Sequence, residues 1–158
     1  AYTKEQILGM EKLMLNTLKF QLTLPTIYNF LARDLKAANM HFDKDVTMLA
    51  SYLVELALVE YSMHKFSYSQ IAVSALYAAC RSYERPEPFP RALAKHAGYT
   101  LESIQPCVSA LVELANKAPT ASLTAVFKKY SAPKYNEAAK RPAPTFLVDE
   151  ANAAAQHQ

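Results

Sequence analysis

The stretch SYSQIAVSALYAAC, residues 67–80, most restricts how this chain can fold. Ser67 and Gln70 have the spacing of a capping box, which marks the start of a helix. Beyond them the residues are apolar or small almost all round, so no side of the helix is suited to face water. The small residues, which would let neighbouring helices approach closely, are Ala72, Ser74, Ala75, Ala78 and Ala79. The stretch predicts a central helix enclosed by other helices.

The rest of the chain also favours helices. Among 158 residues there are two glycines, Gly9 and Gly98, too few for many short strands joined by tight turns. Hydrophobic periodicity predicts a leading helix over 3–20, five core helices at 25–37, 43–65, 67–80, 91–97 and 100–118, and a short terminal helix over 122–130. The predicted fold class is all-α. It has five core helices, one of which is buried at the centre of the others.

Several local features refine this prediction. Thr3 and Gln6 are spaced as a capping box at the start of the leading helix, and Asp43 is expected as the cap of the helix that follows it. Pro25 suits the first turn of a helix, where its missing N–H is not needed. Tyr28 is expected on the apolar side of that helix, and Glu55 is expected in solvent, opposite the apolar stripe of the next one. Gly98 is expected as a left-handed C-cap. Pro106 is expected inside the last core helix, where it should kink the backbone.

The leading helix carries a charge within its apolar side. On a helical wheel Ile7, Met14 and Leu18 lie within roughly 40° of one another, and Glu11 falls inside the same arc. A buried, unpaired carboxylate costs several kcal/mol or is neutralised. Two interpretations follow: either Glu11 has a partner inside its own fold, or this side of the helix is reserved for another molecule.

Signatures of catalysis are missing from the sequence. Two isolated glycines cannot form a phosphate-binding loop. His41, His64, His96 and His157 are not spaced with each other or with the cysteines as a metal site requires. We therefore expect neither an enzyme nor a cofactor or metal.

The cysteines and the apolar runs bear on the compartment. Cys80 and Cys107 lie in apolar helical contexts, which favours structural thiols in a reducing compartment. No apolar run reaches the length of about 18 residues that a membrane span needs, and no signal peptide is visible. No membrane association is expected.

A modest basic cluster lies late in the chain, and the formal net charge is +3. Its members are Lys128, Lys129, Lys134, Lys140 and Arg141. Such a cluster is more often a solvated surface than a nucleic-acid stripe. No nucleic acid is therefore expected as a partner.

Four segments in order resemble the C-terminal part of the mitotic cyclins of A and B type. They are YTKEQILGMEKLMLNTLKFQLTLPTIYNFL, SYSQIAVSALYAAC, GYTLESIQPC and KKYSAPKYNEAAKRPAP. The resemblance implies the last helix of the first cyclin box and its linker over 1–24, the second (C-terminal) box over 25–131, and a C-terminal extension and loose tail over 132–158. The other helices of the first box would lie outside this sequence.

The function implied by the resemblance is that of a regulatory subunit, which activates a cyclin-dependent protein kinase in mitosis, in the nucleus and cytoplasm. The kinase contacts carried over are Glu11, Leu15 and Leu22. Glu11 would bond to kinase backbone near its C helix, and the two leucines would hold apolar side chains of that helix. With so few contacts, the chain alone is not expected to activate the kinase.

Two alternatives remain open at this point. Relatives of the fold resembling TFIIB bind nucleic acid, and the cluster from Lys128 to Arg141 would serve that role. A structural adaptor would instead bind helical partners through Met10 and Met14.

Overall fold

The computed structural model describes residues 1–142 and 144. Its helices are α1 (Lys4–Thr17), α2 (Ile27–Ala37), α3 (Lys44–Leu58), α4 (Tyr68–Ser82), α5 (Arg91–Ala97), α6 (Leu101–Lys117) and α7 (Ala125–Tyr130). Short 3-10 helices lie at Tyr61–Lys65, Ala118–Thr120, Pro133–Tyr135 and Ala138–Lys140. The described residues contain no strand, which confirms the predicted all-α class.

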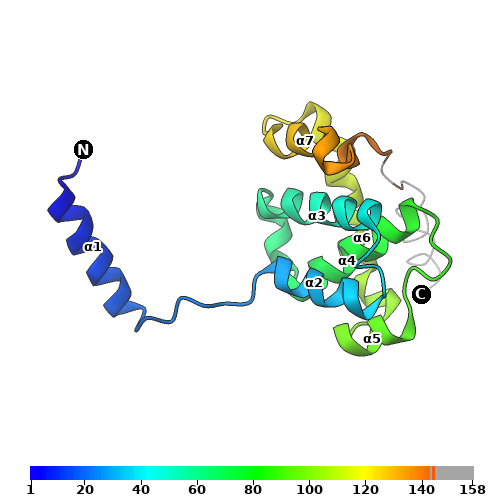
Figure 1. The fold of residues 1–158 in the computed structure, drawn as a ribbon, viewed down its shortest axis with the longest axis horizontal. Helices are drawn as coiled ribbons and strands as arrows, with labels where there is room; N and C mark the ends of the chain where they lie inside the picture. Colours follow the sequence, from blue (N-terminus) through cyan, green and yellow to red (C-terminus); the bar gives the residue numbers. More distant parts are fainter. Residues whose placement is uncertain (143, 145–158) are drawn as a thin grey trace.

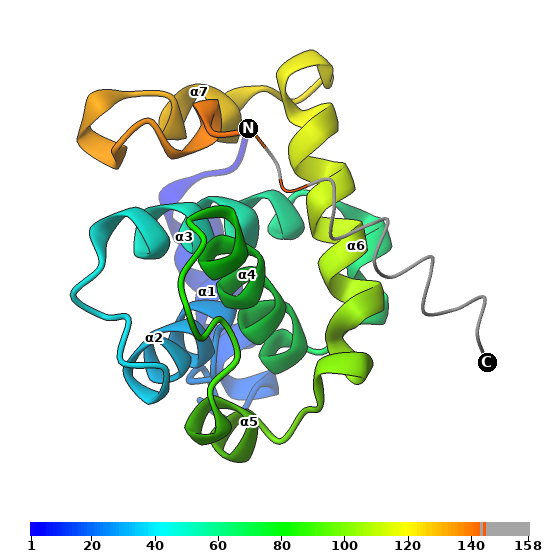
Figure 2. The same ribbon diagram turned by 90° about the vertical axis from the view of Figure 1, so that its right-hand side faces the viewer.

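Helix α4 runs through the centre of a body formed by α2 to α7 (Figures 1 and 2). Every residue from Ile71 to Cys80 is buried, as is Ser82. Helices α2, α3, α5 and α6 all pack against it. The prediction of a central helix enclosed by four others is therefore confirmed.

Side-chain caps start the helices where the sequence places them. The Thr3–Gln6 capping box opens α1, and Asp43 accepts a hydrogen bond from the backbone N–H of Val46 at the start of α3. Gly98 ends α5 at φ 77°, in the left-handed region that favours glycine. Pro106 lies inside α6, as expected.

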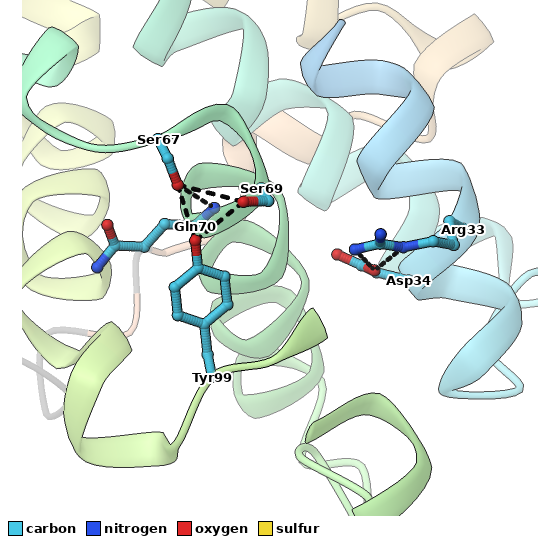
Figure 3. Close-up of polar contacts among 6 residues, drawn as sticks. All are labelled: Arg33, Asp34, Ser67, Ser69, Gln70 and Tyr99. Atoms are coloured by element: carbon cyan, nitrogen blue, oxygen red, sulfur yellow. Dashed lines mark hydrogen bonds and ion pairs between the residues drawn. The ribbon is translucent and has the colours of Figure 1, made fainter. Parts of the chain in front are cut away.

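The N-terminus of α4 is joined to the segment before α6 by a cluster of hydroxyl groups (Figure 3). The Tyr99 hydroxyl lies 2.8 Å from Ser67 Oγ and 2.9 Å from Ser69 Oγ. The predicted capping box is half formed, because the Gln70 side chain donates to the Ser103 carbonyl at 3.0 Å instead of returning to Ser67. The amide thereby links α4 to α6.

The structure corrects both ends of the linker between α1 and α2. Helix α1 ends at Thr17 instead of continuing to Phe20, and Lys19 and Phe20 adopt φ values of 50° and 56°. Helix α2 begins at Ile27 after the cap residue Thr26, so Pro25 precedes the helix rather than forming its first turn. Proline restricts the residue before it to extended backbone, which explains why helix cannot form across this junction.

The buried side of α2 also differs from the prediction. Asp34 is buried on it with Ile27, Leu31 and Leu35, whereas Tyr28 is 66% exposed. Tyr28 lies about 100° from Ile27 around the helix, at the edge of the buried arc, and Asp34 lies inside it. The apolar character of Tyr28 was therefore a poorer guide than its angular position.

Helix α7 is held against α3 by Glu55, which was wrongly expected in solvent. Its carboxylate accepts a hydrogen bond from Lys129 Nζ at 2.6 Å and from the Tyr130 hydroxyl at 2.7 Å. Tyr130 is itself buried. Lys129 and Tyr130, from a distant part of the chain, thus bind a carboxylate that local periodicity predicts to be solvated.

The segment after α7 also packs on the body. Ala138 and Ala139 are buried, and the Arg141 guanidinium donates to the Ser82 carbonyl at the end of α4 while stacking 4.1 Å over the Tyr83 ring. Of the predicted C-terminal extension and loose tail over 132–158, residues 143 and 145–158 lie outside the described residues.

Candidate protein-binding face

Helix α1 stands apart from the body, at the end of an extended linker (Figure 1). None of its residues is buried, although it carries leucines, methionines and an isoleucine. A helix in a soluble protein ordinarily gains most of its stability by packing an apolar side. The helix is capped at Thr3 but lacks such packing within the described chain.

One side of α1 and its linker forms an apolar hollow, here called the α1 face. Its residues are Tyr2, Gln6, Ile7, Met10, Glu11, Met14, Leu15, Leu18 and Leu22. Ile7 is 59% exposed and Met14 56%. A continuous exposed apolar surface of this kind marks a site for protein contact.

The carboxylate of Glu11 lies within the α1 face and is exposed. No hydrogen bond or ion pair joins Glu11 to another of the described residues. The first interpretation of this residue, a partner inside its own fold, is therefore not met in residues 1–142 and 144. What the face presents is a hydrogen-bond acceptor with free lone pairs, surrounded by apolar side chains.

The three residues predicted to contact a partner lie on this one face. Glu11 and Leu15 do so because they are four residues apart on a helix. Leu22 joins them through the turn after α1, where the Phe20 N–H donates to the Leu15 carbonyl at 2.9 Å and the Leu22 N–H to the Phe20 carbonyl at 3.0 Å. Leu15 is half-buried, while Leu22 remains exposed.

A second apolar surface, which the sequence analysis missed, lies where α2, α3 and α7 meet. This α2–α3–α7 groove has a volume of about 610 Å³ and is lined by Thr26, Ile27, Tyr28, Leu31, Ser51, Val54, Glu55, Leu58, Val59, Tyr68, Val126 and Tyr130. Leu58 and Val59 are apolar residues at the C-terminal end of α3, and they were the one sequence feature that could have indicated this groove. Because Tyr28 was expected in the core, the opposite side of the groove was not predicted.

The basic cluster is largely engaged within the protein. Lys129 binds Glu55, Lys140 binds Glu137 at 2.8 Å, and Arg141 binds the end of α4. Cations already paired in this way release few counterions on binding a phosphate backbone. The cluster therefore makes a poor nucleic-acid surface.

The groups considered for catalysis or metal binding are not assembled into a site. Cys80 and Cys107 are buried, and burial raises the pKa of Cys80 to about 12 and that of Cys107 to about 11, so both stay protonated thiols near neutral pH. Within residues 1–142 and 144 no group of three histidine, cysteine or carboxylate side chains could hold a metal ion. His157 lies outside the described residues.

None of the helices in the described part is long and apolar enough to cross a membrane.

An all-α body around a buried central helix, preceded by a separate helix with an exposed apolar face, has the helical arrangement of the cyclin fold. Residues 25–144 match the C-terminal domain of cyclins, so the chain belongs to the cyclin family.

Similar proteins include mitotic cyclins of plants. The chain is 43% identical to Cyclin-B2-4 of Arabidopsis thaliana over 148 residues, which cover 94% of this chain and 34% of that protein. It is 39% identical to G2/mitotic-specific cyclin-1 of Medicago sativa subsp. varia over 149 residues, covering 94% and 34%. It is 42% identical to Cyclin-B2-1 of Oryza sativa subsp. japonica over 149 residues, covering 94% and 35%. The chain thus spans about a third of the length of these relatives.

Proposed function

We propose that this chain is part of a regulatory subunit that binds and activates a cyclin-dependent protein kinase during mitosis. Family membership and the G2/mitotic-specific names of its relatives support the mitotic role. The observation that carries the proposal on this chain is the uncovered α1 face. Subunits of this kind act by binding a kinase, so in this proposal the chain is not itself an enzyme. The proposed place of action is the nucleus and cytoplasm.

The α1 face offers the contacts that such a partner needs. Leu15 and Leu22 hold apolar side chains of the kinase helix that bears the catalytic glutamate, and Glu11 accepts hydrogen bonds from adjacent kinase backbone. Correct placement of that kinase helix assembles the Lys–Glu pair on which phosphoryl transfer depends. A carboxylate amid apolar residues suits this task, because its hydrogen bonds are completed only on docking.

The test is a titration of the chain against a cyclin-dependent kinase, comparing wild type with Glu11→Ala, Leu15→Ala and Leu22→Ala. Each variant should weaken binding by about tenfold or more, as interface anchors do. Leu13→Ala is the matched control, because Leu13 is 58% exposed on the same helix but outside the α1 face. The control should bind like wild type.

Binding that falls equally in all four variants would place the contact elsewhere and contradict the assignment of α1. Absence of binding by wild type calls for the same titration with α1 inside a longer protein that includes the preceding helices of a first box. Continued absence there would refute the kinase partner. We expect the chain alone to bind without activating, and turnover above that of the free kinase would contradict this expectation.

A further inference from the structure

The carboxyl group of Asp34, on α2, is buried with an incomplete set of hydrogen bonds. Its side chain is wholly buried, and the Arg33 guanidinium makes two contacts of 3.0 Å with it, both to Oδ1 (Figure 3). The other oxygen, Oδ2, has no hydrogen-bond partner in the described part of the chain. A buried carboxylate that lacks partners costs free energy, and either a proton or access to water removes that cost.

The charges that act on Asp34 come from two different helices. Burial raises the pKa of the Asp34 carboxyl group, while Arg33, its neighbour on α2, and His96, on α5, both act to lower it. Helices α3 and α4 also pack on α2, but no charged side chain of either is among the described groups that act on Asp34. The charge that α5 supplies is that of a histidine, the side chain that ordinarily gains or loses its proton between pH 5 and 8.

Helix α5 is held to the body by few contacts. Leu93 is its only buried residue, and its first turn has no side-chain cap. Within residues 1–142 and 144, no ion pair or side-chain hydrogen bond joins α5 to another element. Segments with few buried contacts open locally at a lower free energy than the core. Helix α5 can therefore open while α4 stays packed.

We propose that α5 is a cover over Asp34, which opens when this carboxyl group is ionised and His96 is neutral. A proton on Asp34 removes the buried charge, and a proton on His96 offsets it, so either proton favours the docked helix. Opening admits water to Oδ2 and completes its hydrogen bonds. The open population of α5 thus rises with pH, independently of the kinase-binding role proposed for α1.

Hydrogen exchange of the 158-residue chain, resolved by residue, tests the proposal. Each amide rate is divided by the intrinsic rate at the same pH, which leaves the population of open states. From pH 5 to pH 8 the open population of α5 should rise by about fivefold, since a change of one pKa unit corresponds to a factor of ten. At every pH the amides of α5 should exchange faster than those of α4, which open only when the whole body unfolds.

Three variants separate the contributions. Asp34→Asn should abolish most of the rise and slow the exchange of α5 at pH 8, because the amide carries no charge. His96→Gln should raise the open population at pH 5 but not at pH 8, where histidine is ordinarily neutral. Lys95→Gln is the matched control, because Lys95 is exposed on the same helix and does not act on Asp34. It should exchange like wild type.

Two results would overturn the proposal. If α5 exchanged as slowly as α4, it would open only with the whole body and could not act as a cover. If the rise with pH persisted in Asp34→Asn, the buried carboxyl group would not be its cause. Both His96 and Lys95 are exposed, so their variants should fold, and circular dichroism verifies this for all three.

Discussion

At the scale of single residues, Asp34 carries the least expected chemistry in the body. Its side chain is wholly buried on α2, where one oxygen accepts from the Arg33 guanidinium at 3.0 Å and the other has no partner among the described residues (Figure 3). Burial raises the pKa of this carboxyl group, and the charges of Arg33 and of His96 in α5 offset the rise only in part. Compared with the unfolded chain, the folded state therefore holds the proton of Asp34 more tightly, and burial of this carboxyl group lowers stability at a pH above the unfolded-state pKa.

Replacing Asp34 with asparagine should raise the free energy of unfolding at pH 7 by about 1 kcal/mol, because a neutral amide replaces a buried charge of similar size. The folded-state pKa lies above the unfolded-state value, so the penalty in wild type begins to shrink as the pH falls below the folded-state pKa and is gone below the unfolded-state pKa. The gain of Asp34→Asn should shrink with it. Urea unfolding followed by circular dichroism over a series of pH values measures both effects.

The exposed Glu87, which has no ion-pair partner among the described residues, provides the control as Glu87→Gln. It should change stability little at any pH. A gain for Asp34→Asn that stayed constant down to acid pH would show that charge burial is not its cause.

At the scale of elements, α1 is a helix whose own backbone preference decides its stability. Gly9 lies in its interior, and a methyl group added there would meet nothing within 4 Å. Glycine costs a helix interior about 1 kcal/mol relative to alanine. With no buried contact to compensate, this cost falls wholly on α1.

Gly9→Ala should therefore stabilise α1 by about 1 kcal/mol and slow the exchange of its backbone amide hydrogens by about fivefold, without changing the unfolding of the body. Hydrogen exchange resolved by residue measures the first effect and urea unfolding the second. The matched variant Gly98→Ala should instead lower the free energy of unfolding of the body. The reason is that φ 77° at the end of α5 strains any residue with a Cβ. Faster exchange in Gly9→Ala would contradict the helical role assigned to this position.

At the scale of the whole molecule, the two ends of the chain contribute unequally to its stability. The segment 1–24 has no buried residue, whereas the segment after residue 131 buries Ala138 and Ala139 and places Arg141 at the end of α4. Stability follows the apolar surface and polar groups removed from water, not the number of helical residues.

Deleting residues 1–24 should change the free energy of unfolding by less than about 0.5 kcal/mol, as for a change that removes no buried contact. Deleting residues 132–158 should lower it by about 2–4 kcal/mol. Urea unfolding of both truncated chains beside wild type tests the pair. The single variant Arg141→Ala should reproduce part of the second loss, and its failure to do so would assign the loss to the buried alanines alone.

Local patterns predicted much of this architecture. The helical class, the central position of α4, the caps at Thr3 and Asp43 and the left-handed Gly98 depend on periodicity or on side-chain to backbone bonds within a few residues. Each is confirmed, because interactions between near neighbours in sequence are fixed by the sequence itself. The interrupted apolar arc of α1 was visible for the same reason.

The sequence by itself thus determined which segments are helical and which sides of them are apolar. The tertiary structure alone decided which of those sides are covered. Glu55 pairs with Lys129 and accepts a hydrogen bond from Tyr130, both more than seventy positions away, Asp34 is buried although it is ionisable, and the groove exists only where three helices meet. Burial and pairing depend on contacts between distant segments, and helical periodicity holds no information about which segments those are.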